Sequence, residues 1–227
     1  MHSMNELEAR WQRITQHIEK LQQNSLLGGR KVTLIAVSKG QPSQKIEQLL
    51  IAGQRVFGEN RLQEAETRWA KQDALYNEVE LHFIGTLQSN KIKEVLNQFD
   101  ALHTLDRKKL VDSIAQERKI QTAHRCKTFF VQVNTGQEPQ KGGVIPAEVA
   151  EFLQYCASHG LAISGLMCIP PAGEPPAPHF ALLANMARKY GLAYLSMGMS
   201  EDYETAIRLG ATHVRVGTAL FGQREPV

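Results

Sequence analysis

The sequence predicts an α/β protein in which eight strands and eight helices alternate to close a single (β/α)8 barrel. Short apolar runs of strand length alternate with helical periodicity, and no two runs are joined by a hairpin signal, so the strands should be parallel. About eight such units fit into 227 residues, an ordinary length for this barrel. An open doubly wound sheet is the competing arrangement, but the G-x-G-x-x-G typical of its dinucleotide-binding forms is absent.

The elements follow in order from this pattern. An amphipathic helix is expected first, at about residues 5–23, and its apolar residues recur at spacings of three and four. These residues are Leu7, Trp11, Ile14, Ile18 and Leu21. The expected strands are 32–38, 55–60, 80–85, 101–106, 128–134, 162–169, 193–199 and 213–218. The expected helices between them are 43–52, 61–74, 88–98, 107–121, 146–159, 178–190 and 201–209.

No linker, charge run or low-complexity tract divides the chain, so we expect residues 1–227 to form one domain. The proline-rich stretch PPAGEPPAP at 170–178 lies between a strand and a helix, which favours a rigid βα loop over a domain boundary.

Composition excludes several classes of function. The chain has 26 Lys plus Arg against 23 Asp plus Glu, and this net charge of +3 gives no clustered basic footprint for nucleic acid. Cys126, Cys156 and Cys168 are scattered without a C-x-x-C pair, so neither a disulfide framework nor a zinc site is indicated. The sequence shows neither a secretory signal nor a run of ~20 apolar residues that could span a membrane. We therefore expect a cytoplasmic protein with no membrane partner.

Polar residues follow the last two predicted strands, and in such barrels chemistry collects where strands end and βα loops begin. The seventh strand runs into SMGMSED at 196–202, and the eighth into RVGTALFG at 215–222. Ser200 stands at a helix start, Gly217 permits close backbone approach, and Thr218 offers a hydroxyl. The loops after strands seven and eight are the recurring phosphate site of these barrels. The two turns together therefore predict an anion site of phosphate size.

Lys39 ends the first predicted strand, in TLIAVSKGQP at 33–42. A solvated strand end is the ordinary role for such a lysine. In a closed barrel, however, strand one neighbours strand eight, so Lys39 would face the predicted phosphate site. An amine among apolar neighbours is nucleophilic in its free form. An amine opposite a phosphate site suits an aldehyde that carries a phosphate, either pyridoxal 5′-phosphate (PLP) or a sugar-phosphate substrate of an aldolase, and spacing alone does not separate these two.

Long motifs give the chain a resemblance to one family. These motifs are AVSK (36–39), FGENRLQEA (57–65), LHFIGTLQSNKIK (81–93), VNTGQEPQKGG (133–143), GLMCIPP (165–171), LSMGMSEDYETAI (195–207) and VRVGTALFG (214–222). Together they resemble the pyridoxal phosphate homeostasis protein family, small PLP-binding proteins related to the barrel domain of alanine racemase. The resemblance covers about residues 30–224 and implies an alanine-racemase-like (fold type III) TIM-type barrel with an extra N-terminal helix.

The resemblance also implies roles for single residues. Lys39 would form a Schiff base with PLP, Ser200 and the Gly217–Thr218 turn would hold the phosphate, and Arg215 would approach the pyridine nitrogen. Asn60 and Met167 would line the pocket. A permanently charged guanidinium at that nitrogen disfavours its protonation, which holds back carbanion chemistry on the cofactor. The structural alternative for Arg215 is a cation of the barrel interior paired with an acid.

Structural roles are expected for several other polar residues. Asp106 and Ser200 precede predicted helices and are of the types preferred as N-caps. His82 and His103 lie within apolar runs, so each is expected to be a buried, hydrogen-bonded core residue, and no ligand spacing indicates a metal. Lys141 is expected to be a solvated loop lysine, with a second amine that loads or releases PLP as the sharper hypothesis.

Three functions remain open. The favoured one is a PLP-binding protein of intracellular PLP homeostasis that delivers the cofactor without robust catalysis, with apo PLP-dependent enzymes as candidate partners. Alanine racemase uses a second domain that contributes a tyrosine base, whereas this chain stops at Val227, close after the last predicted strand, so we expect no second base and a monomer. The alternatives are a PLP-dependent amino-acid racemase or lyase (or a cofactorless aldolase) and a regulatory PLP-binding protein.

Overall fold

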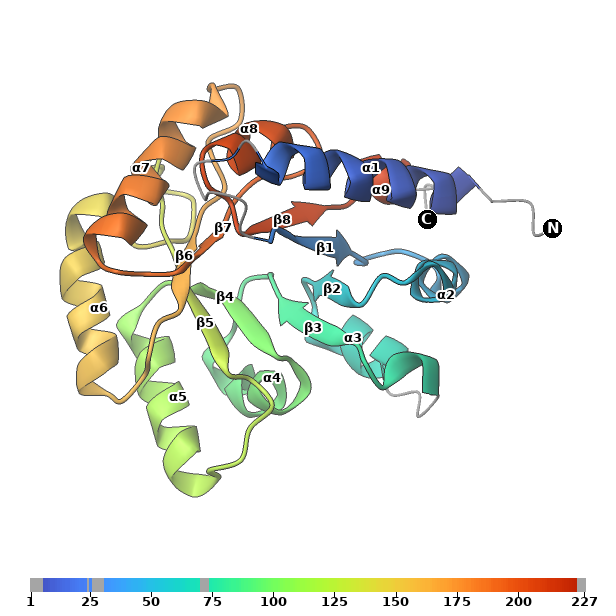
Figure 1. Ribbon diagram of the computed structural model, residues 1–227. Helices are drawn as coiled ribbons and strands as arrows, with labels where there is room; N and C mark the ends of the chain where they lie inside the picture. The colour runs from blue at the N-terminus through green and yellow to red at the C-terminus, as the bar shows by residue number, and fades with distance from the viewer. Residues whose placement is uncertain (1–5, 24, 26–30, 70–73, 224–227) are drawn as a thin grey trace.

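The strands close into a parallel barrel whose spatial order, β1 to β8, follows the sequence (Figure 1). The computed structural model describes residues 6–23, 25, 31–69 and 74–223. The strands are β1 Thr33–Val37, β2 Val56–Glu59, β3 Glu80–Phe83, β4 Ala101–Leu105, β5 Thr128–Gln132, β6 Gly165–Met167, β7 Tyr194–Ser196 and β8 His213–Val216. The predicted eight-stranded parallel barrel is therefore confirmed. Strands β6 and β7 are shorter than expected.

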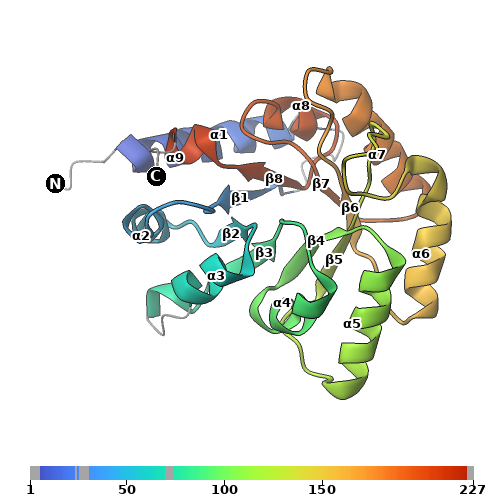
Figure 2. The same cartoon turned by 180° about the vertical axis from the view of Figure 1, so that it is seen from behind.

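The helices form the outer layer around these strands (Figures 1 and 2). They are α1 Glu6–Gln23, α2 Ser43–Ala52, α3 Leu62–Trp69, α4 Ile92–Gln98, α5 Lys108–Ile120, α6 Val149–Ser158, α7 Pro176–Lys189, α8 Tyr203–Arg208 and α9 Thr218–Phe221. Short 3-10 turns lie at Ala74–Tyr76, Ser89–Lys91 and Pro146–Glu148. The helix expected over 61–74 ends at Trp69, and 70–73 lie outside the described residues. Strands covered on both faces explain the near-continuous apolar runs, as in β4, where every residue is buried.

The barrel closes between its first and last strands. Thr33 of β1 pairs with His213 of β8, and Ala36 pairs with Val216 further along the same two strands. This register brings the carboxyl ends of β1 and β8 together, so Lys39 and Gly217, which follow them, lie at the same mouth of the barrel.

The N-terminal helix α1 packs outside the barrel against α2, α8 and α9 (Figure 2). Leu7, Ile14 and Ile18 of its predicted apolar stripe are buried. Trp11 Nε1 donates a hydrogen bond to Gln54 Oε1 at 2.9 Å, and Gln54 Nε2 donates to the carbonyls of Leu34 at 2.8 Å and Val56 at 2.6 Å. The helix is thus fastened to β1 and β2. No helix among the described residues is long and apolar enough to cross a membrane.

Candidate cofactor site

A cavity of about 360 Å³ opens at the carboxyl-terminal end of the barrel. Its walls are Val37, Lys39, Asn60, Ile84, Ile169, Met199, Ser200, Glu201, Asp202, Arg215, Gly217 and Thr218. The structure thus brings together six of the seven residues singled out in the sequence. The seventh, Met167, is fully buried in β6 and does not line the cavity, whereas Ile169, two residues further along the same strand end, does.

Lys39 is half-buried at the wall of this cavity, directly after β1. The residue before it is held firmly, because the Ser38 hydroxyl donates to Glu59 Oε1 at 2.7 Å and the Ser38 N–H donates to the Gly58 carbonyl at 3.0 Å. Glu59 is itself buried and accepts from Arg68 Nη1 at 2.5 Å. The buried carboxylate network at the ends of β1 and β2 therefore fixes the backbone from which Lys39 projects.

The Ser200 hydroxyl joins the loops that follow β7 and β8. Its Oγ accepts hydrogen bonds from the backbone N–H groups of Gly217 and Ala219, each at 3.2 Å. Ser200 is not a helix N-cap: α8 begins at Tyr203, and Asp202 is the flanking residue. The two N–H groups gathered here are donors of the kind that bind a phosphate oxygen.

The loop after β7 is shaped by Gly198, whose φ of +93° lies in the left-handed region. A Cβ at this position would lie 2.6 Å from the Cβ of Ala206 and 2.9 Å from the Cα of Tyr203. The Gly198 carbonyl accepts from the Arg215 N–H at 2.9 Å, which ties the loop to β8. Only glycine fits here, so the position of Ser200 depends on Gly198.

Arg215 is a buried cation without a carboxylate in direct contact. Only 4% of the residue is exposed, and the guanidinium donates from Nη1 to Ser196 Oγ at 2.7 Å and from Nη2 to the Cys168 carbonyl at 2.9 Å. Burial lowers the pKa of the guanidinium from its ordinary value. The structural alternative, an ion pair with an acid, is absent among the described residues, since both partners are neutral groups.

Asn60 adds a polar atom that the protein leaves unsatisfied. Its Oδ1 is buried and has no hydrogen-bond partner among the described residues. The backbone around it is close-packed, because a Cβ on Gly85 would lie 2.0 Å from the Asn60 carbonyl oxygen. A buried unpaired acceptor at a cavity wall is the kind of group that a ligand satisfies.

The predictions for the other polar residues had different outcomes. His82 and His103 are buried and hydrogen-bonded, as predicted. Asp106 is not the N-cap of α5: the flanking residue is Arg107, and Asp106 pairs with its guanidinium at 2.7 Å. Lys141 is a loop lysine whose amine lies 2.6 Å from Glu138 and whose side chain is 33% exposed.

Cys168 stands beside Arg215, and burial raises the pKa of its thiol to about 12. Such a thiol stays protonated and is a weak nucleophile at neutral pH. No cluster of potential metal ligands occurs among the described residues.

Comparison with known proteins decides the family. The model of the alanine racemase N-terminal domain matches residues 9–225. The pyridoxal phosphate homeostasis protein of Aquifex aeolicus is 38% identical over 232 residues, which cover 98% of this chain and all of that protein. The chain belongs to the pyridoxal phosphate homeostasis protein family. The family member of Pseudomonas aeruginosa is 39% identical over 86% of this chain and 85% of its own length.

Solved structures of the pyridoxal phosphate homeostasis family share the fold. PipY of Synechococcus elongatus without PLP superposes with a TM-score of 0.82 at 32% identity, over 96% of this chain and all of that one. The same protein with PLP bound superposes with a TM-score of 0.78 at 31% identity, again over 96% of this chain and all of that one. Alanine racemase of Corynebacterium glutamicum, at 18% identity and a TM-score of 0.65, matches 97% of this chain and 62% of its own, which shows a shared barrel fold.

Proposed function

We propose that this chain binds pyridoxal 5′-phosphate at the carboxyl-terminal cavity, with Lys39 as the Schiff-base lysine. The supporting observation is that one cavity joins Lys39, the buried Arg215 guanidinium and the Ser200–Gly217 turn. These are the groups that an aldehyde, a pyridine nitrogen and a phosphate require. A relative of the same family, PipY, has been solved with PLP bound.

The residues present fit this cofactor on structural grounds of their own. Among the residues that the structure describes, the buried Asn60 Oδ1 has no partner, and the buried Arg215 guanidinium meets only neutral acceptors. The cavity of about 360 Å³ suits a small aromatic phosphate. PLP supplies an aldehyde that condenses with a primary amine and a ring that accepts electrons from the carbon attached to that amine.

Each residue then has a definite task. The Ser200 hydroxyl and the Gly217–Thr218 turn to which it is bonded would hold the phosphate. Arg215 would direct its guanidinium at the ring nitrogen. Because that guanidinium stays charged, it opposes protonation of the nitrogen and keeps the ring a poor electron acceptor. Asn60 would form a hydrogen bond at the edge of the ring. Met167 is a buried residue of β6.

This arrangement favours storage and delivery of PLP over turnover of amino acids. Racemisation needs a proton donor and an acceptor on opposite faces of the substrate. Among the described residues that line this cavity, Lys39 is the only primary amine, and the two acids, Glu201 and Asp202, both follow β7. We infer a homeostasis role as a cytoplasmic monomer, single-domain over residues 1–227, with apo PLP-dependent enzymes as recipients. A PLP-dependent racemase or lyase is the alternative.

The deciding experiment is borohydride trapping. The purified chain is mixed with PLP, reduced and digested, and the labelled lysine is identified by mass spectrometry. We expect the label on Lys39, with complete loss of the visible absorption band in Lys39→Ala. Lys108→Ala, on the outer face of α5 and paired with Glu151, is the matched control and should keep the band. A label on another lysine, or a band that survives in Lys39→Ala, would contradict the assignment.

The same preparation separates the alternatives. Solvent deuterium exchange into the α-position of amino acids is followed by NMR, with free PLP at equal concentration as the reference. We expect no exchange above that reference. Exchange well above it would favour the racemase or lyase and exclude the delivery role as the sole function.

A further inference from the structure

A chain of hydrogen bonds crosses the interior of the barrel from Arg215 to Glu80. Arg215 Nη1 donates to Ser196 Oγ at 2.7 Å, and the same oxygen lies 2.8 Å from His103 Nδ1. His103 Nε2 lies 2.9 Å from His82 Nδ1, and His82 Nε2 lies 2.8 Å from Glu80 Oε1. We call these five residues the barrel relay. None of its contacts exceeds ordinary hydrogen-bond length.

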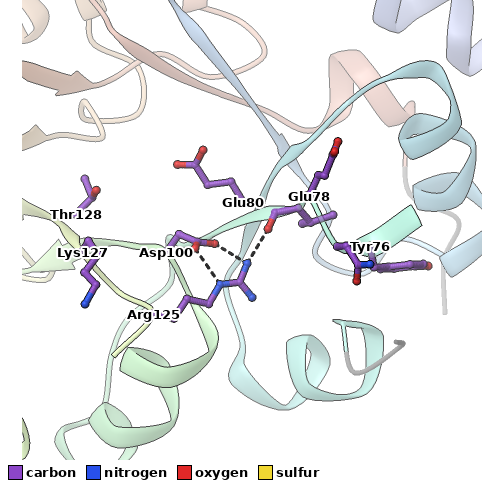
Figure 3. A pocket seen from close by; sticks show the side chains of 9 residues that line it. Tyr76, Glu78, Glu80, Asp100, Arg125, Lys127 and Thr128 are labelled. Atoms are coloured by element: carbon purple, nitrogen blue, oxygen red, sulfur yellow. Dashed lines mark hydrogen bonds and ion pairs between the residues drawn. The ribbon is translucent and has the colours of Figure 1, made fainter. Parts of the chain in front are cut away.

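The barrel relay joins the two ends of the molecule. Arg215 lines the cofactor cavity, whereas Glu80 begins β3 and lines a second cavity, of about 710 Å³, at the amino-terminal end. Figure 3 shows Glu80 in that cavity, beside the pair formed by Asp100 and Arg125. The three intervening side chains, Ser196, His103 and His82, are at most 1% exposed. Water therefore reaches the relay only at its Glu80 end or through the cofactor cavity.

The chemistry of the groups fixes the direction of donation along the barrel relay. An ionised Glu80 carboxylate only accepts, so His82 carries its proton on Nε2 and presents a bare Nδ1. His103 then donates from Nε2 and accepts at Nδ1 from the Ser196 hydroxyl. Ser196 keeps its lone pairs for Arg215. With both imidazoles neutral, every donor meets an acceptor in a single direction.

The electrostatics of the barrel core agree with a neutral His103 in the relay. Burial is the main reason that the pKa of His103 lies well below its ordinary value, and the hydrogen bond from His82 lowers the pKa of Glu80. The charged and titratable groups that face the relay from neighbouring strands and loops are His213, Arg125, Asp202 and Cys168. A buried cation without a carboxylate in contact is costly. The barrel relay supplies a carboxylate, that of Glu80, at the end opposite Arg215.

We propose that Glu80 is a positioning residue for Arg215: through His82 and His103 its carboxylate orients the Ser196 hydroxyl so that Ser196 Oγ holds the guanidinium against the cofactor cavity. No proton leaves or enters in this role. The consequence for cofactor affinity rests on the proposed PLP function, whereas the orientation of the relay does not.

The test replaces the acceptor by a donor. Glu80→Lys should reverse every hydrogen bond from His82 to Ser196, because an ammonium can only donate. Glu78→Lys is the matched control, since Glu78 lines the same cavity and bears the same charge but pairs with Arg55, outside the relay. Both are compared with the unaltered chain, free of PLP, as ¹⁵N-histidine-labelled protein at about pH 8, above the ordinary pKa of histidine.

We expect the proton of His103 on Nε2 in the unaltered chain and in Glu78→Lys, and on Nδ1 in Glu80→Lys. Glu80→Ala, which offers neither donor nor acceptor, should give a mixture of both tautomers and serves if Glu80→Lys folds poorly. The same His103 tautomer in the unaltered chain and in Glu80→Lys, or an Nδ1 proton in the unaltered chain, overturns the relay.

A second readout is the affinity for PLP, measured by titration of the visible band. Glu80→Lys should weaken binding roughly tenfold relative to Glu78→Lys, the scale of one charge-assisted hydrogen bond. In a Ser196→Ala background the same change should have little further effect, because the link to Arg215 is cut. Equal affinities of Glu80→Lys and Glu78→Lys overturn the positioning role. If the unaltered chain binds no PLP, the proposed function fails, and the tautomer measurement still decides the relay.

Discussion

The two ends of the barrel use their polar residues differently. At the amino-terminal end the charges are satisfied by one another: Arg125 pairs with Asp100 at 2.7 Å, and Arg55 pairs with Glu78 at 3.4 Å. At the carboxyl-terminal end, within the described part of the chain, Asn60 Oδ1 has no partner and Arg215 meets only neutral acceptors. The contrast teaches that charge alone does not mark a binding site, since the more highly charged cavity, at the amino-terminal end, is the one whose charges pair with one another.

The largest effect is expected from glycines at the two ends of one strand. Gly198 follows β7 and Gly191 precedes it, and both have positive φ, at +93° and +67°. Gly198→Ala should lower PLP affinity roughly 100-fold, because its Cβ would collide with Ala206 and displace Ser200. Affinity is measured by titration of the visible band.

Gly191→Ala is the control for that change. Its Cβ would meet nothing within 4 Å, so it adds backbone strain of about 1 kcal/mol and no collision. It should reduce the free energy of unfolding and leave the affinity unchanged. Equal losses of PLP affinity in Gly198→Ala and Gly191→Ala would show that the carboxyl-terminal end of β7 matters no more for binding than its amino-terminal end.

A smaller effect concerns pH and the interior near the amino-terminal end. Burial lowers the pKa of His213 to about 3. As pH falls from about 6.5 toward 3, the unfolded chain binds a proton that the folded chain does not, so the free energy of unfolding decreases by up to about 1.4 kcal/mol per pH unit. His213→Phe, which suits the neighbouring Phe130 and Tyr194 rings, should make this decrease shallower in urea unfolding at pH 5 and pH 7. An unchanged slope would show that other groups carry the dependence.

The smallest effect is expected at the charged cavity itself. Asp100 accepts from the Leu81 N–H at 2.7 Å and from Arg125. Asp100→Ala should cost about 1–2 kcal/mol in the free energy of unfolding, with PLP affinity unchanged. Asp100→Asn keeps an oxygen for Leu81 and should cost less. A clear loss of PLP affinity in either variant would contradict the division between a structural and a binding end.

Much of the fold was predictable from local pattern. The alternation of apolar runs and helical stretches predicted the closed parallel barrel, and strand ends then predicted that Lys39, Ser200 and Gly217 would meet. The bounds were less accurate where a run extends beyond the hydrogen-bonded ladder: 162–169 reads as one strand, but only Gly165–Met167 pairs with both neighbours. Apolar character reports burial, and the loops of a barrel mouth are buried too.

The barrel relay could not be predicted from the sequence. Its histidines were predicted to be buried, but their pairing with Ser196 and Arg215 depends on the register of four strands around a closed ring, which no local pattern contains. One signal was present: His82 and His103 occupy consecutive parallel strands. The hydrogen bonds of Ser200 could not be predicted for a related reason, since its partners, Gly217 and Ala219, come from the next βα unit.

The closure of β1 on β8 has a consequence for synthesis. The strand β1 must wait for β8, which is synthesised much later, before both of its edges are paired, and α1 likewise waits for α8 and α9. Until β8 emerges, the nascent sheet presents two open edges and uncovered apolar faces, the surfaces on which chains aggregate. Long-range pairing of this kind folds slowly, so aggregation competes with folding until β8 has been synthesised.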